Sequence, residues 1–352
     1  MRTWSQESFD GNETFSRTLQ DGIRRAAERI VASLCRGKTV FACGNGGSAG
    51  LAQQFASALL HRFETDRQPL PAVDLVSCSG VATAIANDAS TETIFSRQLE
   101  AFARRGDVLL ACTASGDSRN VLRAVETAHA KDMLCIAVTG KGGGTLARQL
   151  TDFDMELRVP ARASADIRDA HQSLLLSLCR RIDEQVPEGP ILAETVQPSW
   201  ENLRRLTDGL RPLVFTNGVF DLLHRGHLQN LKAASEQGVC LVVGVNSDAS
   251  VKTLCKGDDR PIQSTQDRMA ILAEFPFVDY VTSFDEYTPE SLIRTIAPDV
   301  LVKGGDYAPE QIAGYGFIRE RGGKVLTLPF VHDCSTTNLI AKIRGGNTKA
   351  SK

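Results

Sequence analysis

The sequence predicts an α/β protein with two three-layer domains, each built on a mostly parallel sheet. Its 352 residues suit two domains of about 150 residues each. Apolar strand-like runs alternate with helical stretches along most of the chain, as in parallel sheets that helices cover on both faces. Each half also contains a strand, a glycine-rich turn and a helix in succession, which is typical of phosphate-binding α/β domains.

In the first half, a long amphipathic helix precedes the strands. Phe15, Leu19, Ile23, Ile30 and Leu34 share one face of it at helical spacing. We expect strands at 39–43, 72–76, 107–111, 133–138 and 154–157, and helices near 48–61, 91–103, 119–130, 145–150 and 165–184. Together they form a predicted domain over residues 1–184.

Proline and glycine then interrupt the pattern. Residues 185–205 hold three prolines and a glycine, which predicts a linker with at most a short helix. A second series of strands is expected at 213–216, 240–245, 280–283, 300–303 and 324–328, within a domain over 206–346. The small, polar residues 347–352 predict a disordered tail.

Composition excludes several classes of protein. The net charge of −2 and the pI of about 6.3 give no basic field for nucleic acid. No apolar run approaches the roughly 18 residues of a membrane span, so we expect no membrane partner. The nine cysteines form no C-x-x-C pair, and an odd number disfavours a disulfide framework. We therefore expect buried thiols in a cytoplasmic protein.

Two histidines in the second half point to a phosphate site. The stretch from Thr216 to His227 reads T-N-G-V-F-D-L-L-H-R-G-H, after an apolar strand and before a helical pattern. This places His224, Gly226 and His227 near a helix N-terminus, where free N–H groups attract phosphate. A chance pair explains H-x-x-H alone equally well. Zinc would prefer i, i+4 spacing and a further ligand.

The rest of this half carries more specific motifs. V-N-S-D-A-S begins at Val245, L-V-K-G-G-D-Y at Leu301 and C-S-T-T-N-L-I at Cys334. With H-R-G-H, they make residues 207–344 resemble the cytidylyltransferase-like nucleotidyltransferases. Within these, the half is most similar to the adenylyltransferases that make ADP-heptose and pyrophosphate from heptose 1-phosphate and ATP. ATP is thus the expected nucleotide, and the choice between ATP and CTP stays open.

The resemblance implies in-line attack of a sugar phosphate oxygen on the α-phosphate of a nucleoside triphosphate. Such a transfer needs positioning and positive charge, with Mg²⁺ on the triphosphate. The implied catalytic residues are His224, His227, Lys252 and Lys256. The implied nucleotide-binding residues are Thr216, Asn217, Gly218, Phe220, Gly226, Asn246, Asp248, Arg268, Ser335, Thr336 and Thr337. Asp221, Lys303 and Asp306 are expected on the sugar-phosphate side.

The first half holds two turns that suit a phosphorylated ligand. G-N-G-G-S-A begins at Gly44, and C-T-A-S-G-D-S begins at Cys112, each after a predicted strand. The alternative is that each is a tight turn with a capping serine. With A-N-D, F-S-R-Q and L-R-V-P, these motifs make residues 10–184 resemble the sugar-isomerase (SIS) fold, specifically phosphoheptose isomerase. The resemblance implies phosphate binding by Asn45, Ser48, Thr113, Ser115 and Ser118, with Asp88 near the substrate.

The first half departs from that family at the metal. The isomerase holds zinc with a His and a Glu on one helix and a Gln and a His on another. Those positions here read Gln54, Ala58, Arg168 and Leu176, whereas His61 and His171 lie elsewhere. We therefore expect no zinc and a non-catalytic SIS domain.

Three hypotheses follow. The first is a nucleotidyltransferase with a non-catalytic SIS domain. The second is a bifunctional isomerase and adenylyltransferase that isomerises without metal. The third makes the SIS half a module that senses a phospho-sugar or binds a partner. We also expect a homo-oligomer, a dimer or a tetramer, because SIS domains bury their first helix against neighbours and the apolar face from Phe15 to Leu34 suits such contacts.

Overall fold

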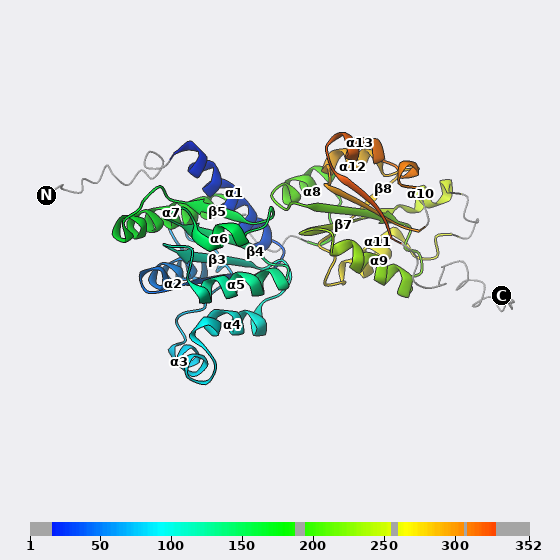
Figure 1. Cartoon of the computed structure of the whole chain (residues 1–352). Helices are drawn as coiled ribbons and strands as arrows, with labels where there is room; N and C mark the ends of the chain where they lie inside the picture. Colours follow the sequence, from blue (N-terminus) through cyan, green and yellow to red (C-terminus); the bar gives the residue numbers. More distant parts are fainter. Residues whose placement is uncertain (1–15, 187–193, 255–259, 306–307, 329–352) are drawn as a thin grey trace. The chain divides into compact units, whose positions relative to one another are not determined.

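The computed structural model describes residues 16–186, 194–254, 260–305 and 308–328 (Figure 1). The chain divides into two compact units, Met1–Ala193 and Glu194–Lys352. Each unit contains a five-stranded sheet whose named strands all pair in parallel. Helices cover both faces of each sheet, so the predicted fold class is confirmed.

The first sheet has the strand order β2-β1-β3-β4-β5. Its strands are β1 (Val40–Gly44), β2 (Ala72–Asp74), β3 (Val108–Thr113), β4 (Leu134–Thr139) and β5 (Met155–Arg158). The helices are α1 (Arg17–Leu34), α2 (Gly47–Leu60), α3 (Ser79–Asp88), α4 (Ile94–Phe102), α5 (Arg119–Ala130), α6 (Gly144–Gln149) and α7 (Ser164–Gln185), with a 3₁₀ turn η2 at Thr91–Thr93. The predicted strands and helices thus occur within a few residues of their expected bounds.

The side chains of successive strand residues point to opposite faces of this sheet. Val40 and Ala42 pack in one apolar cluster with α1, α2 and α7. Phe41 and Cys43 pack in the other with α4, α5 and α6. Because both faces are covered, β1, β3 and β4 are buried along their whole length, which explains their continuous apolar sequences.

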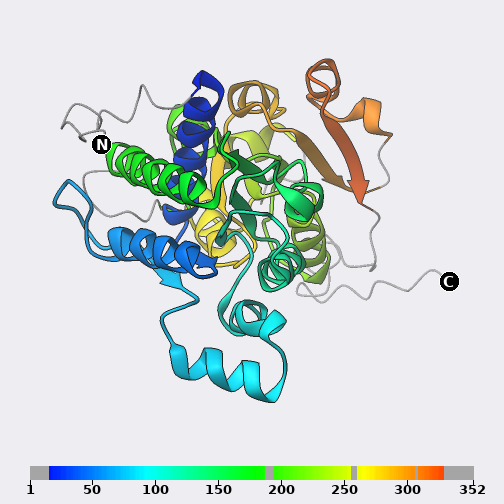
Figure 2. The same cartoon turned by 60° about the vertical axis from the view of Figure 1, so that its left-hand side comes forward.

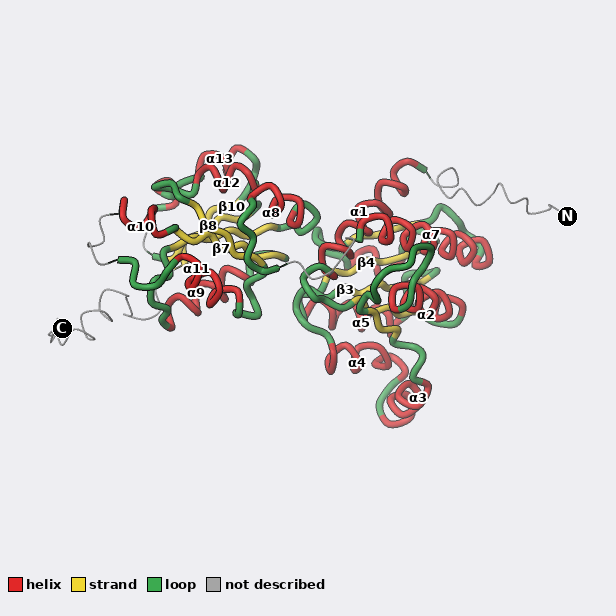
Figure 3. The backbone as a smooth tube through the Cα atoms, turned by 180° about the vertical axis from the view of Figure 1, so that it is seen from behind, coloured by secondary structure: helices red, strands yellow, loops and turns green. Residues whose placement is uncertain are grey.

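Helix α3 was not predicted. It has no buried residue, and it lies away from the sheet in all three views (Figures 1, 2 and 3). Its sequence, S-G-V-A-T-A-I-A-N-D, consists mostly of small residues without an apolar stripe. Periodicity therefore gave no signal for it.

The expected role of the first helix is corrected. Ser16 caps α1 by accepting a hydrogen bond from the Leu19 N–H. Leu19, Ile23, Ile30 and Leu34 are all buried within the core of their own unit. Since the unit itself uses these side chains, the described part of the apolar face is not available to a neighbouring subunit, and Phe15 lies outside the described residues. The oligomer remains a prediction without this argument.

The second sheet has the strand order β10-β9-β6-β7-β8. Its strands are β6 (Leu213–Gly218), β7 (Cys240–Asn246), β8 (Tyr280–Phe284), β9 (Val300–Gly304) and β10 (Lys324–Leu328). The helices are α8 (Trp200–Thr207), α9 (Arg225–Ser235), α10 (Asp248–Thr253), α11 (Thr265–Ala273), α12 (Glu290–Ile296) and α13 (Tyr315–Glu320), with a 3₁₀ turn η3 at Pro309–Gln311. Residues of α9 and α11 share an apolar cluster with one face of the sheet, and α8 and α12 lie on the other side (Figure 1).

Part of the segment expected as a linker over 185–205 belongs to the second unit. Val196 forms a β-bridge with Val281 of β8, and the Trp200 indole N–H donates to the Ser283 carbonyl over 3.0 Å. These contacts attach residues 194–205, including the start of α8, to the second unit. Proline-rich composition indicated a break but could not show that the chain after it rejoins a sheet.

Two further expectations concern thiols and membranes. The cysteines in the described ranges are all free, and all but Cys78 are buried. No helix in the described ranges is both long and apolar enough to cross a membrane.

Candidate functional site

Both predicted phosphate regions lie where the strand order of a sheet reverses. In the second sheet the chain runs from β6 to β7 and β8 on one side, then returns to β9 and β10 on the other. In the first sheet it runs from β1 to β2, then returns to β3, β4 and β5. Such reversals open a crevice at the carboxyl ends of parallel strands, where ligands commonly bind.

In the second unit, the strand order reverses between β6 and β9. Lys303 of β9 reaches across to β6, and its Nζ donates to the backbone carbonyl and the side-chain oxygen of Asn217 over 3.1 and 3.0 Å. Thr216, beside Asn217, is buried and pairs in register with Val302. Three of the predicted residues thus meet at the carboxyl end of the central strand.

His224 and His227 lie at the N-terminus of α9, as the sequence predicted. His224 is the N-cap residue, and its side chain makes no capping hydrogen bond. The two imidazole rings are stacked, with centroids 3.9 Å apart and planes 21° from parallel. Phe220 packs its ring against His227 at 5.3 Å in an edge contact. Burial lowers the pKa of His224, which favours the neutral imidazole near pH 7.

Serine side chains cap three other helices of this unit. Ser199, Ser247 and Ser264 accept N–H groups at the starts of α8, α10 and α11. The N-cap residue of α9 is a histidine whose side chain makes no capping hydrogen bond, at a position where serine, threonine, aspartate or asparagine is preferred. The start of α9 therefore presents N–H donors and two imidazoles to an incoming anion.

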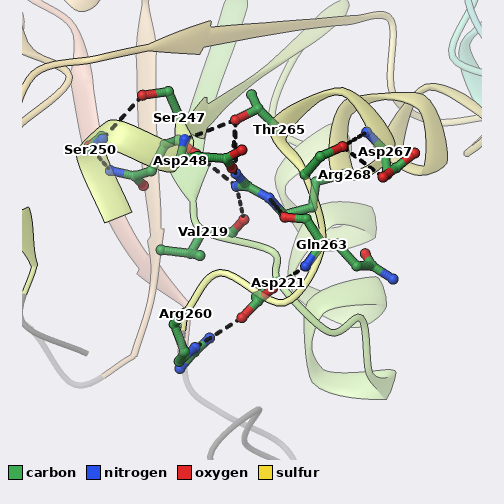
Figure 4. A network of polar contacts seen from close by, with 12 residues as sticks. Val219, Asp221, Ser247, Asp248, Ser250, Arg260, Gln263, Thr265, Asp267 and Arg268 are labelled. Atoms are coloured by element: carbon green, nitrogen blue, oxygen red, sulfur yellow. Dashed lines mark hydrogen bonds and ion pairs between the residues drawn. The ribbon is translucent and has the colours of Figure 1, made fainter. Parts of the chain in front are cut away.

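Arg268 of α11 lies buried at the carboxyl ends of β6 and β7 (Figure 4). Its side chain is fully buried, and its guanidinium donates to the carbonyls of Val219 and Asn246, each over 2.7 Å. It also contacts Asp248 over 2.5 Å and the Thr265 hydroxyl over 3.1 Å. Burial tends to raise the pKa of Asp248, but hydrogen bonds from Thr265 and Arg268 outweigh it and hold the pKa below its ordinary value.

Asp221 is buried and anchors a neighbouring segment. Its carboxylate pairs with the Arg260 guanidinium over 2.9 Å and accepts the backbone N–H groups of Ile262 and Gln263 over 2.7 and 3.1 Å. The sequence assigned Asp221 to the sugar-phosphate side and gave Arg260 no role. A paired carboxylate with backbone partners could not be recognised without the fold, since Arg260 lies 39 residues away.

The other predicted residues of this unit are placed as follows. Asn246 is buried, and its amide donates to the Ser250 hydroxyl over 2.9 Å. Lys252 is exposed on α10. Gly218 ends β6, and Gly226 is buried in the first turn of α9. Lys256, Asp306, Ser335, Thr336 and Thr337 lie outside the described residues.

In the first unit, the two predicted turns face each other across the strand reversal. Asn45 follows β1, and its amide exchanges hydrogen bonds of 2.7 and 2.8 Å with Asn120 of α5. In the turn after β3, the Thr113 hydroxyl accepts the Gly116 N–H, and the Ser115 hydroxyl accepts the Asp117 N–H. Ser118 is the N-cap of α5, but its side chain makes no capping bond. The alternative of a capping serine is therefore wrong for Ser118.

Gly116 is required at its position by both space and backbone. Its φ is +74°, and a Cβ there would lie 1.8 Å from the Gly143 carbonyl oxygen. Two hydrogen bonds from Thr145 to Asp117 tie the same turn to α6, and they hold the pKa of Asp117 below its ordinary value. The turn 113–118 is thus held in one shape by its neighbours.

The four positions at which the resemblance implies zinc ligands do not form a zinc site here. Gln54, Ala58 and Leu176 line a pocket of about 250 Å³ between α2 and α7. Its lining is mixed, with apolar Leu51, Phe55, Phe63 and Leu175 beside Ser57, His61, Arg62, Gln172 and Cys179. Arg168 lies apart from the pocket, and its side chain packs beside Gly47. His171 is 1% exposed in the core, where burial lowers its pKa. Among the described residues, no three His, Cys, Asp or Glu ligand atoms converge at this pocket, so it does not suit zinc.

In the described part of the chain, His129, Cys135 and Asp154 form the one group of three potential metal ligands. Asp154 already accepts the Cys135 and Thr151 N–H groups, and its Oδ2 lies 2.8 Å from His129 Nε2. Burial raises the pKa of the Cys135 thiol well above its usual range, so the thiolate ligand is disfavoured. Hydrogen bonding accounts for this group without a metal.

Comparison with known proteins agrees with this division. A model of the SIS domain matches residues 3–140, and a cytidylyltransferase-like model matches residues 215–341. The phosphoheptose isomerase of Alteromonas mediterranea is 45% identical over 180 residues, covering 51% of this chain and 91% of the relative. That of Shewanella sediminis is 47% identical over 168 residues, covering 48% and 85%. The solved phosphoheptose isomerase from Francisella tularensis is 39% identical, covers 51% of this chain and 92% of that chain, and has a TM-score of 0.47. The chain therefore belongs to the phosphoheptose isomerase family of SIS domains through its first unit, which is fused to a cytidylyltransferase-like domain.

Proposed function

We propose that the chain is a nucleotidyltransferase that joins a heptose 1-phosphate to a nucleotide, with ATP as the first candidate, and releases pyrophosphate. The observation that carries this proposal is the stacked pair His224 and His227 at the start of α9, a helix whose N-cap side chain forms no cap. The cytidylyltransferase-like match over 215–341 supports the same reaction class.

In the proposed reaction, a phosphate oxygen of the sugar attacks the α-phosphorus of the triphosphate. A new P–O bond forms as the bond from the α-phosphorus to the bridging oxygen breaks, and pyrophosphate leaves. His224, His227 and the N–H groups of α9 donate to phosphate oxygens that gain charge in the transition state. Lys303, held by Asn217, adds a fixed positive charge at the end of β9. Exposed Lys252 is a candidate mobile cation.

Mg²⁺ enters this proposal with the triphosphate. Asp221 and Asp248, the two described carboxylates among the predicted residues, already pair with Arg260 and Arg268. They are thus poor candidates for a protein-held metal, and the phosphate oxygens themselves supply ligands that Mg²⁺ prefers.

The SIS domain is proposed to be non-catalytic. Its relatives are named as isomerases, but Gln54, Ala58 and Leu176 supply neither a zinc ligand set nor an acid–base pair, and no group of three potential metal ligands among the described residues lies at their pocket. A second candidate role is the binding of a phosphorylated sugar. It is favoured by Ser118, the N-cap residue of α5 whose side chain makes no capping bond, and by the turn 113–118, which its neighbours hold in one shape. Titration calorimetry with sedoheptulose 7-phosphate tests that role. The double variant Ser115→Ala, Ser118→Ala should abolish any binding, and equal affinity in the variant excludes this site.

The nucleotidyltransferase proposal is tested by incubating the full chain with heptose 1-phosphate and each of ATP, CTP and GTP. We expect pyrophosphate release that requires both substrates and is fastest with ATP. Release with CTP but not with ATP would mean that CTP is the nucleotide substrate. No release with any of the three nucleotides would reject the proposed function.

A further inference from the structure

Among the described residues, Arg268 has the largest fully buried side chain. A guanidinium carries five N–H donors, and burial makes each unpaired donor costly. Nε donates to the Gln263 carbonyl, Nη1 to the carbonyls of Val219 and Asn246, and Nη2 to the Asp248 carboxylate and the Thr265 hydroxyl. Five donors therefore meet five acceptors within the protein, and none remains for a phosphate.

One of these acceptors lies in the turn that precedes the two histidines. Val219 follows the end of β6, and its carbonyl oxygen accepts from Arg268 over 2.7 Å. The next residue, Phe220, has φ +50°, a left-handed conformation that a bulky side chain adopts only when its surroundings impose it. The Phe220 ring packs against His227, which stacks on His224.

The same turn is attached a second time to the segment before α11. Asp221 binds the backbone N–H groups of Ile262 and Gln263 and pairs with Arg260. Val219 and Asp221 are thus both hydrogen-bonded to the segment 260–268, in the network that Figure 4 shows. Arg268 also joins this turn to β7 through Asn246 and to α10 through Asp248.

We propose that Arg268 is a positioning residue, which fixes the Val219–Asp221 turn and through Phe220 sets the orientation of His227 and His224. This inference rests on the proposed function of the two histidines. It replaces the expectation that Arg268 contacts the nucleotide, since that contact would require breaking a saturated buried network.

The first test needs no substrate. Hydrogen exchange of the amides of residues 219–227 is measured by mass spectrometry on the full chain, in the wild type and in Arg268→Lys. Lysine keeps the charge but has three donors on one atom, so it cannot reach acceptors on β6, β7 and α10 together. We expect exchange to speed up about tenfold or more in the variant, because buried hydrogen bonds that order the turn are lost. Exchange within about twofold of the wild type would overturn the proposal.

Two variants make this result interpretable. Arg294→Lys changes an exposed arginine on α12, and it should leave exchange in 219–227 unchanged. Thr265→Val removes one acceptor of Arg268 at a half-buried site, so it tests the same network if Arg268→Lys does not fold. We expect a smaller acceleration in the same segment. If Arg268→Lys does not fold and Thr265→Val exchanges its 219–227 amides as slowly as the wild type, Arg268 contributes only to general stability. That result would contradict the proposal.

The second test is kinetic. Arg268→Lys should lower kcat for pyrophosphate release about 100-fold and change the nucleotide KM less than about threefold, since positioning acts on the transition state. Combined with His227→Ala, it should cause no more than about threefold further loss, because both changes act through the same ring. Losses that multiply would show that Arg268 acts independently of His227, and a raised KM with unchanged kcat would show a direct nucleotide contact; either result would overturn the proposal. If the wild type releases no pyrophosphate, the proposed function fails, whereas the exchange result still decides whether Arg268 orders the turn.

Discussion

The imidazole rings of His224 and His227 stack with their centroids 3.9 Å apart at the first turn of α9. At this distance a charge on one ring disfavours a charge on the other, and a bound polyanion would favour charge on both. The pair is therefore a site whose protonation should respond to phosphate.

His224→Ala and His227→Ala should each lower pyrophosphate release by about 100-fold or more, because each removes a donor to oxygens that gain charge in the transition state. Both residues are half-buried, and circular dichroism should show that the fold survives. His61→Ala, in the first unit, is the matched control and should leave turnover unchanged. Near-normal turnover in both test variants would remove the histidines from the mechanism.

The protonation of His224 can be followed by NMR. Burial lowers its pKa, so the imidazole carbon shifts of the free protein should titrate below the ordinary value of about 6.5. The charged form is disfavoured in the folded state, so this histidine costs stability as the pH falls below about 6.5, where the unfolded chain gains a proton. Adding a nucleoside triphosphate should raise the pKa, because anionic oxygens favour the imidazolium. A pKa that does not move at saturating nucleotide would contradict phosphate binding at this residue.

A buried ion pair in the first unit gives a stability prediction. Arg67 Nε lies 2.7 Å from Asp183 of α7, and the same guanidinium donates to the carbonyls of Ala58 and Leu59 at the end of α2. Arg67→Met should lower the free energy of unfolding by about 3–5 kcal/mol, because it leaves a buried carboxylate unpaired. Denaturant unfolding provides the measurement.

The control for that variant is Arg294→Met, which breaks an exposed pair with Glu290 and should cost about 0–1 kcal/mol. Burial tends to raise the pKa of Asp183, but hydrogen bonds from Arg67 and two backbone N–H groups lower it overall. The contribution of Asp183 is therefore present above the unfolded pKa of about 3.9 and is lost as the pH falls through the folded pKa. Equal losses of unfolding free energy in Arg67→Met and Arg294→Met would show that burial does not make the Arg67–Asp183 pair contribute more to stability.

The first unit should bind no stoichiometric zinc and should not isomerise sedoheptulose 7-phosphate. Three of the four relevant positions are Gln54, Ala58 and Leu176, which line one pocket, and the fourth is an arginine beside Gly47. Elemental analysis of the purified chain and an isomerase assay with and without a chelator make the measurement. About one zinc per chain would mean that His61 or His171 has joined a rebuilt site. Turnover insensitive to chelators would mean that another acid, such as Asp88, transfers the proton.

Sequence patterns predicted most of the fold because parallel strands buried on both faces have continuous apolar sequences. Strands such as Val108–Thr113 were recognised in this way. Helix α3 was missed because it buries no residue, so no stripe marks it. The apolar stripe of α1 was recognised, but a stripe does not say whether its own domain or a neighbour covers it.

The candidate site was predicted less completely. The turn 216–227 is local in sequence, so its strand, its histidines and its helix start could be read together. The roles of Arg260 and Arg268 depend on acceptors 39 and 49 residues away, which no local pattern reveals. The motif predicted Arg268 as a nucleotide-binding residue, and the hydrogen bonds show that its donors contact acceptors within the protein.

Attack on the α-phosphate at the β6–α9 turn can be followed by ³¹P NMR of the full chain with heptose 1-phosphate and ATP. We predict that the ATP signals disappear together and that pyrophosphate and a nucleoside diphosphate sugar appear in equal amounts. His227→Ala should form neither product at a comparable rate. Formation of ADP with a phosphorylated sugar or inorganic phosphate would mean attack at the γ-phosphate and would contradict the proposed reaction.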